Sequence, residues 1–256
     1  MTDFMHLFSD TLVMLVRNLR KYLRVPQLIV FSTIQPVMFL LLFTFVFGGA
    51  IKVPGGEHYL NFLLPGILVQ TSLFGSMQTG VGLADDLTRG MMDRFRSLPM
   101  AHLAVLAGRT LADLCRNVFV IFLMTSIGLL VGFRFATDTL HAFAALALIL
   151  FFSFAFSWIS AAIGLAVKHT ETAQVAGFIW IFPLVFASSI FVPPSSMPAW
   201  LRAFAEHSPV TLTVNAVRAL TRGGATFPVT WQALAWIVGI LMVFVPLAVN
   251  RYRKSV

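Results

Sequence analysis

The chain has 256 residues, of which 58% are hydrophobic and 11% are charged, and phenylalanine alone occupies 26 positions. A composition this apolar argues against a water-soluble globular domain and predicts a membrane protein, because a membrane-spanning helix needs about 20 consecutive apolar residues. The net charge of +8 comes without a basic patch interleaved with aromatic residues, so no nucleic-acid partner is expected.

Residues 1–25 are predicted to form an amphipathic helix. Apolar residues recur at helical spacing along one face, namely Phe4, Phe8, Leu12, Leu15, Leu19 and Leu23. The opposite face carries Arg17, Arg20, Lys21 and Arg24. We expect this helix to lie in the membrane surface with its basic face toward lipid phosphates or a cytosolic protein. The alternative is an anchor with no further role.

Six segments are apolar enough to be membrane-spanning helices, and they predict an all-α integral membrane protein. They are residues 27–49, 59–83, 117–132, 140–167, 173–192 and 231–250. Long stretches are apolar on every face, whereas the strands of a membrane barrel alternate between lipid-facing and lumen-facing residues. The third segment is short, so its helix is expected to begin earlier, inside the charged segment that precedes it.

That charged segment, residues 85–116, holds nine charged side chains between the second and third spans. Such a concentration of charge in an otherwise apolar protein predicts contact with a partner in water. Near its end, Arg109, Asp113 and Arg116 lie at i, i+4 and i+7 on one helix face, where opposite charges pair. We expect structural charge pairing there; the alternative is that this ion set transmits motion from the loop.

The second and fifth spans each present a face suited to ligands. Phe178, Phe182 and Phe186 form one aromatic stripe, and the second span mixes amides with soft apolar groups at Gln70, Phe74, Met77 and Gln78. Aromatic and methionine side chains with a few amides suit large amphipathic ligands, so these seven residues are predicted to line a substrate path. The alternative is packing against lipid or a neighbouring helix.

Residues 193–230 contain five prolines and a Gly-Gly pair and are predicted to form an outer segment that re-enters the membrane without crossing it. A short helix is expected over 196–206. A second is expected to start at Ser208 and Pro209, with the serine as cap and the proline in the first turn, and to run to about Leu220.

Basic residues indicate the orientation, because cytoplasmic loops of membrane proteins are enriched in lysine and arginine. With both termini in the cytoplasm, 13 basic residues fall inside: Arg17, Arg20, Lys21, Arg24, Arg89, Arg94, Arg96, Arg109, Arg116, Lys168, Arg251, Arg253 and Lys254. Five fall outside: Lys52, Arg134, Arg202, Arg218 and Arg222. The single cysteine, Cys115, is predicted to be a buried, inert thiol.

Catalytic signals are weak. The chain contains no H-E-x-x-H and no G-x-S-x-G motif, and its six histidines are scattered over different segments, so neither a metal centre nor a catalytic site is expected. It also lacks the G-x-x-x-x-G-K-[ST] phosphate-binding loop. Any energy-dependent work would therefore need nucleotide bound by another polypeptide.

Several short motifs, in their order and spacing, resemble permeases of the second ATP-binding-cassette type. They include Arg-Ser-Leu-Pro at 96–99 and Ala-Gly-Arg-Thr-Leu-Ala-Asp at 107–113. The outer motifs, Phe-Val-Pro-Pro at 191–194, Met-Pro-Ala-Trp-Leu at 197–201 and His-Ser-Pro-Val-Thr at 207–211, resemble the daunorubicin-resistance branch of that family. The resemblance runs nearly from end to end.

The resemblance implies one multi-pass permease domain in the cell membrane, paired with a second permease copy or paralogue and with two cytosolic ATPase subunits that bind ATP and magnesium. The chain itself would hold no cofactor. Docking on the ATPase is implied for the N-terminal helix and for a coupling helix over 87–98, with Arg89, Asp93, Arg94 and Arg96 as contacts. The implied cargo is hydrophobic or amphipathic: a drug, a natural product or a lipid, exported from the cytoplasm or inner leaflet.

Three other functions are alternatives. An importer permease that depends on a binding protein also has a cytoplasmic coupling loop, but Gly90 and the Leu-Pro pair at 98–99 are too close for that signature. An intramembrane enzyme needs convergent polar groups, and the serines of the spans have no histidine or aspartate at matching depth. A channel needs a polar ring along its pore, and no such ring is evident.

Overall fold

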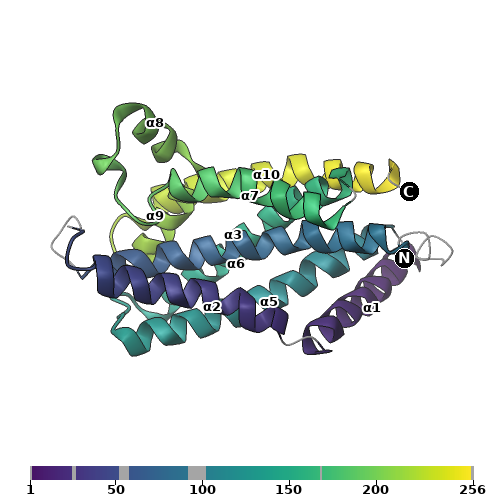
Figure 1. The fold of residues 1–256 in the computed structure, drawn as a ribbon, viewed down its shortest axis with the longest axis horizontal. Helices are drawn as coiled ribbons and strands as arrows, with labels where there is room; N and C mark the ends of the chain where they lie inside the picture. The colour runs from purple at the N-terminus through teal and green to yellow at the C-terminus, as the bar shows by residue number, and fades with distance from the viewer. Residues whose placement is uncertain (1, 25–26, 52–57, 92–101, 168, 255–256) are drawn as a thin grey trace.

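The computed structural model describes residues 2–24, 27–51, 58–91, 102–167 and 169–254, and these form a bundle of α-helices (Figure 1). In chain order the described helices are α1 (Thr2–Arg24), α2 (Gln27–Leu42) with the π-helical turn η1 (Phe43–Phe47), α3 (Tyr59–Thr88), α5 (His102–Val131), α6 (Thr139–Val167), α7 (Thr170–Phe186), the 3-10 turn η2 (Pro194–Ser196), α8 (Ala199–His207), α9 (Pro209–Arg222) and α10 (Thr226–Lys254). The all-helical prediction is confirmed.

Four of the described helices, α3, α5, α6 and α10, are long and apolar enough to cross a membrane. The third predicted span does begin early, at His102. The segments predicted as first and fifth spans form shorter apolar helices, Ser32–Phe47 and Thr170–Phe186. These lengths confirm a multi-pass protein with four long candidate spans, not the predicted set of six.

The helix of the fifth predicted span ends early because hydrogen bonds of Ser188 and Ser189 replace those of a continuing helix. α7 stops at Phe186, not at 192. The hydroxyl of Ser188 donates to the carbonyl of Val185 at 2.6 Å, and the backbone N–H of Ser189 donates to Thr211 Oγ1 at 3.0 Å. Local side-chain hydrogen bonds of this kind offer the backbone an alternative to the helix, so residues 187–193 form a turn that leads to η2 and α8.

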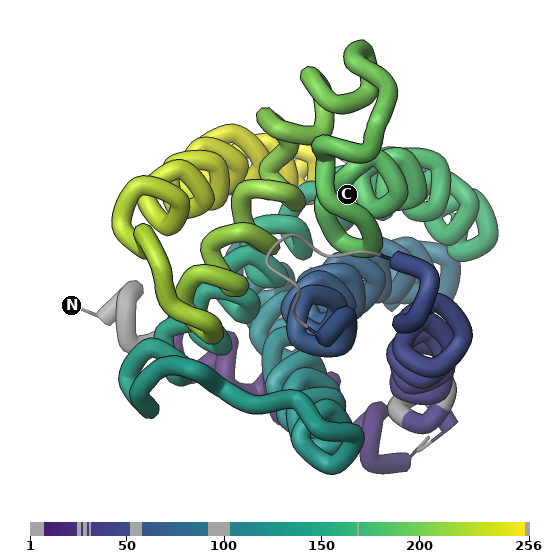
Figure 2. The backbone as a smooth tube through the Cα atoms, turned by 90° about the vertical axis from the view of Figure 1, so that its left-hand side faces the viewer, coloured from purple at the N-terminus to yellow at the C-terminus, as the bar shows by residue number. Residues whose placement is uncertain are grey.

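Helix α3 lies at the centre of the bundle, with the other long helices around it (Figure 2). Its apolar window is 83% buried, against 22% for α10. α6 approaches it closely because Gly80 and Gly164 face each other; a Cβ at Gly164 would collide with the carbonyl of Gly80, and one at Gly80 with the backbone of Ser160. Glycine is therefore required where these two helices cross.

Helix α1 packs along α5 with a face that the sequence pattern did not predict. Met14, Asn18 and Tyr22, spaced four residues apart, are buried. The predicted apolar stripe is largely exposed, with Phe8 at 63% and Leu23 at 78%. The helix thus has three faces, because Tyr22 turns inward to meet the buried Asp113 of α5 while Phe8 and Leu23 remain free to contact lipid.

The segment predicted to face outward contains two short helices, as predicted. α8 spans Ala199–His207 and projects from the bundle, and α9 spans Pro209–Arg222 and packs against α3, α6 and α10 (Figure 1). Ser208 precedes α9 as expected but makes no capping hydrogen bond. The start of α1 and the end of α10 both lie at the end of the bundle opposite α8 (Figure 1).

Candidate functional site

The predicted ion set forms a buried cluster around Asp113 of α5. The Asp113 side chain is fully buried and accepts hydrogen bonds from Arg109 Nε at 3.3 Å, from Thr79 of α3 at 2.6 Å and from the hydroxyl of Tyr22 of α1. Arg116 Nη1 lies 4.0 Å from the other carboxylate oxygen. A buried carboxylate is tolerated only when it is paired and hydrogen-bonded, and here one aspartate ties together α1, α3 and α5.

A second chain of hydrogen bonds extends from this cluster to α6. Arg116 Nη2 donates to the carbonyl of Gly75 at 2.6 Å and to Asn117 Oδ1 at 3.1 Å. Asn117 in turn donates to Ser153 Oγ of α6 at 2.6 Å. The absence of a side chain at Gly75 makes this possible, since a Cβ there would overlap the Asn117 amide. The prediction located the three charged residues but missed their neutral partners.

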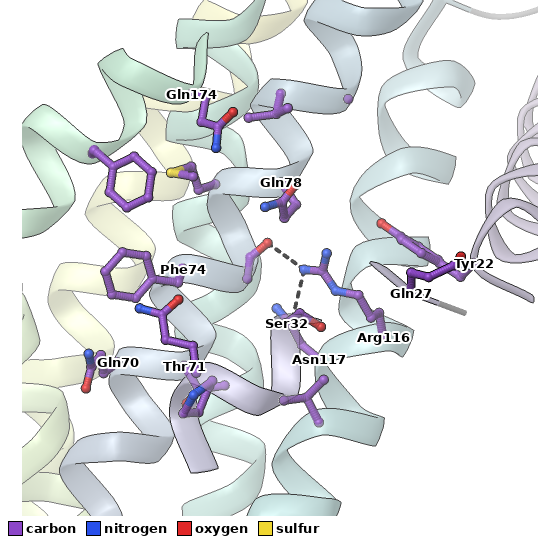
Figure 3. Close-up of a pocket in the computed structure, with 18 of the residues that line it drawn as sticks. Tyr22, Gln27, Ser32, Gln70, Thr71, Phe74, Gln78, Arg116, Asn117 and Gln174 are labelled. Atoms are coloured by element: carbon purple, nitrogen blue, oxygen red, sulfur yellow. Dashed lines mark hydrogen bonds between the residues drawn. The ribbon is translucent and has the colours of Figure 1, made fainter. Parts of the chain in front are cut away.

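A pocket of about 520 Å³ opens beside the ion set, between α2, α3, α5 and α7 with the end of α1 (Figure 3). Five of the seven predicted path residues line it: Gln70, Phe74, Met77, Gln78 and Phe178. Arg109 and Arg116 of the ion set line the same pocket. The structure therefore joins two groups of residues that sequence reasoning treated separately.

Phe182 and Phe186 lie outside the pocket lining but continue its aromatic wall. The Phe74 ring centroid lies 6.0 Å from that of Phe178 and 6.3 Å from that of Phe182, and Phe182 stacks on Phe186 at 5.0 Å. The row goes on through Phe191, 5.5 Å from Phe186. Phe178, Phe182 and Phe186 are each 36% to 48% exposed, so the predicted stripe forms a continuous accessible surface.

Sequence reasoning missed several residues of the pocket, notably Gln35 and Phe39 of α2 and Gln174 of α7. Gln35 and Gln174 are isolated amides in apolar helices, and such amides are costly in a membrane unless they meet a partner or water. That cost was the available signal. Among the described residues, no group of three His, Cys, Asp or Glu side chains is placed to hold a metal ion.

The predicted docking residues divide into three groups. Arg17 pairs with Asp86 at 3.3 Å and Lys21 with Asp85 at 3.1 Å, so these two tie α1 to the end of α3. Arg89 also pairs with Asp85, at 2.8 Å, within the end of α3 itself. Arg20 and Arg24 are exposed. Asp93, Arg94 and Arg96 lie outside the described residues.

Only the first part of the predicted coupling helix over 87–98 is described. Leu87 and Thr88 are the last two residues of α3, and Arg89 follows it. Gly90, with φ of +65°, adopts the left-handed conformation that glycine favours after a helix.

Arg218 of α9 was assigned only to the outer charge balance, yet it organises the far end of α3. Its guanidinium donates to the backbone carbonyls of Phe62 at 2.9 Å, Ser189 at 2.7 Å and Ile190 at 3.1 Å. It also lies 3.5 Å over the ring of Phe62. Its backbone acceptors are neutral and far away in the sequence, so no spacing pattern signals them.

The prediction that Cys115 is buried is wrong: its side chain is exposed on α5. The reason is helical geometry, because the buried face of α5 carries Asp113, Arg116 and Asn117, and Cys115 points away from them.

Comparison with known proteins finds relatives that match most of the chain. The family model described as ABC-2 type transporter matches residues 9–221. A daunorubicin resistance ABC transporter permease protein, DrrB1, of Streptomyces coeruleorubidus is 36% identical over 96% of this chain and 87% of its own length. A probable doxorubicin resistance permease, DrrC, of Mycobacterium tuberculosis is 24% identical over 96% of this chain and 90% of its own length. A putative transport permease, ycf38, of Cyanophora paradoxa is 29% identical over 83% of this chain and 74% of its own length.

The family model and the relatives agree. The chain belongs to the ABC-2 type transporter family and is a transmembrane permease subunit, with ATP hydrolysis supplied by a partner ATPase.

Proposed function

We propose that the pocket between α2, α3, α5 and α7 is part of the path by which this permease exports a hydrophobic or amphipathic cargo, of the drug, natural-product or lipid type. The observation that carries the proposal is the joining of the aromatic wall and the amides of α3 in one pocket of about 520 Å³. That size is in the range of pockets that enclose drug-sized ligands. Phe182 and Phe186 extend the path toward the α8 end of the bundle.

We further propose that the permease works as a pair, with an identical copy or a paralogue, on two cytosolic ATPase subunits. The ATPase docks on the exposed basic residues Arg20 and Arg24 of α1 and on the segment after α3, which begins with Arg89 and includes Asp93, Arg94 and Arg96. Arg17 and Lys21 belong to the same face and support it through their ion pairs with Asp86 and Asp85.

This geometry supports a route for coupling. A pull on the end of α3 acts on α1 through the ion pairs of Asp85 and Asp86, and on α5 through the hydrogen bond between Thr79 and Asp113. Closing and opening the ATPase pair would then alternate the pocket between two accessible states. The permease contributes differential affinity for cargo in these states, and the free energy enters from ATP.

For this function the chain must lie with both termini and the α3–α5 connection in the cytoplasm. Ala225→Cys and Arg253→Cys, at the two ends of α10 in a Cys115→Ser background, test this orientation. An impermeant thiol reagent added to intact cells should label the first position and spare the second. The reverse pattern would refute docking at this end of the bundle.

Reconstitution with the partner ATPase tests the function itself. We expect cargo-stimulated ATP hydrolysis and ATP-dependent transport in wild type, and loss of both, with normal membrane insertion, when Arg94 and Arg96 are changed to glutamate. Arg202→Glu on the projecting helix α8 is the matched control and should retain both activities. Full coupling in the Arg94 and Arg96 double variant would rule out docking by this segment.

A further inference from the structure

We propose that the cargo site is selective for amphiphiles with an anionic headgroup, such as a phosphate or carboxylate, bound at the wall formed by Lys21, Arg109 and Arg116, with the apolar body against Phe39, Phe74 and Phe178. The inference rests on the proposed function, since it takes the pocket to be the cargo site. It adds the charge of the cargo to the proposed function.

The charges around the pocket are unequal. Lys21, Arg109 and Arg116 line it, and Asp85 is the one acidic residue among the described lining residues. Asp85 is shared, because both Lys21 and Arg89 pair with it. Asp113, behind the lining, is likewise shared between Arg109 and Arg116. Asp86, next to Asp85, pairs with Arg17. Three carboxylates thus face five cations, and this end of the pocket carries net positive charge.

The arginines are held in place but are not saturated. Within the described part of the chain, Arg116 meets the Gly75 carbonyl, Asn117 Oδ1 and, at 4.0 Å, Asp113. Arg109 meets Asp113 and the carbonyl of Gln78. A guanidinium has five N–H donors in a rigid fork suited to carboxylate and phosphate oxygens. Both side chains are only 6% exposed, so an anion here would be bound away from bulk water, where charge pairing is strong.

The other wall has the opposite chemistry. Figure 3 shows the ring of Phe74 on one side of the pocket and the guanidinium of Arg116 on the other. The amides of Gln70 and Gln78 also line the pocket. Gln70 is 5% exposed, and its Oε1 is buried without a partner among the described residues. An orphaned acceptor of this kind calls for a donor on the ligand, such as a hydroxyl between headgroup and apolar body.

Three probes with the same 18-carbon chain test the charge preference: oleyl phosphate, oleyl alcohol and oleylamine. Each is titrated against the purified permease in detergent, with thermal stabilisation as the readout. We expect oleyl phosphate to bind about tenfold more tightly than oleyl alcohol, as hydrogen bonds to charged groups imply, and oleylamine to bind most weakly. Equal binding of the three, or a preference for the amine, would overturn the proposal.

Two substitutions on the pocket rim should move this preference in opposite directions. Lys21→Gln should reduce the preference for the phosphate and Asp85→Asn should increase it. Arg20→Gln, at the next position of α1 and absent from the pocket lining, should change nothing. Both rim side chains retain solvent contact, so these variants are expected to fold. An unchanged preference in both would contradict the assignment.

Phe74→Ala distinguishes a failure of the headgroup inference from a failure of the proposed cargo site. If the pocket is the cargo site and the inference holds, the variant weakens all three probes while the order of preference remains. Weakening without any charge order would reject the headgroup inference alone. No weakening of any probe would reject the pocket as the cargo site. Inorganic phosphate is the remaining arm: if it binds as tightly as oleyl phosphate, the site takes a free anion and the amphiphile proposal fails.

Discussion

Two sites with buried arginines lie at different levels of the central helix α3. The arginines of the two sites are stabilised by different kinds of partner. At the level of Thr79, Arg109 and Arg116 both pair with the carboxylate of Asp113. About 25 Å away along the helix, at Phe62, Arg218 is held by backbone carbonyls and an aromatic ring.

This difference in partners indicates a different role for each site. The first site borders a pocket and connects helices that carry the proposed coupling surface, so its charges can respond to ligand and partner. The second fills a junction where α9 and the turn after α7 meet the start of α3, and its acceptors are neutral backbone and side-chain oxygens, which carry no charge that could change sign. One site suits transmission; the other suits a fixed support.

The largest expected effect comes from breaking the first site. Asp113→Asn leaves Arg109 and Arg116 without a counter-charge, and removing one partner of a buried pair typically costs about 3–5 kcal/mol. The free energy of unfolding, or the midpoint of thermal unfolding in detergent, measures it. Asp138→Asn, an exposed aspartate beside His141, is the control and should cost under about 1 kcal/mol. Equal effects would mean that the ion set is not the tie that we describe.

A smaller loss is expected at the second site. Arg218→Met keeps much of the apolar contact with Phe62 but leaves three backbone carbonyls without their donor, which costs about 1–3 kcal/mol. The same unfolding measurement applies, and Arg222→Met, on the same helix and with less burial, is the comparison. A loss larger than that of Asp113→Asn would reverse the ranking of the two sites.

Tyr22 gives the first site a dependence on pH. Burial, and next the nearby charge of Asp113, raise the pKa of Tyr22 to about 12 from an ordinary value of 10.0. A raised pKa in the folded state contributes stability that is complete below pH 10 and is lost as the pH rises through 12. Two pKa units correspond to roughly 2–3 kcal/mol. Tyr22→Phe should therefore flatten the fall in unfolding free energy between pH 10 and 12, and an unchanged slope would argue against this burial of the phenol.

The smallest effect is expected where α1 meets the end of α3. The pair of Lys21 and Asp85 is partly exposed, and pairs of that kind contribute under about 1 kcal/mol. Lys21→Gln should therefore leave the unfolding midpoint nearly unchanged although it alters ligand preference. A loss comparable with that of Asp113→Asn would show that the rim pair is structural and weaken its use as a probe of the pocket.

The parts of this picture that the sequence predicts are those with local periodicity. Phe178, Phe182 and Phe186 share a face because they are four residues apart, and Asp113 pairs with Arg109 for the same reason. Proline after serine located the start of α9. These patterns depend only on helical geometry.

The remaining parts depend on contacts between distant segments. Tyr22 meets Asp113, and Arg218 meets Ser189 and Phe62, through the way the helices pack, which a single sequence does not encode in any spacing. The stop of α7 at Phe186 likewise required the partner Thr211 on α9. The pocket is formed by the packing of α2 and α7 against α3, which no local sequence pattern predicts.

The central claim is that this pocket carries cargo, and Phe178→Ala in the complex with its ATPase tests it most directly. Half-saturating cargo concentration is read from stimulated ATP hydrolysis, beside Phe143→Ala, an exposed phenylalanine on α6 outside the pocket. Loss of an aromatic contact worth about 1–3 kcal/mol should weaken apparent affinity by up to about a hundredfold for Phe178→Ala, with no change for Phe143→Ala. Identical half-saturating concentrations for wild type and Phe178→Ala, in complexes of equal stability, would contradict the account.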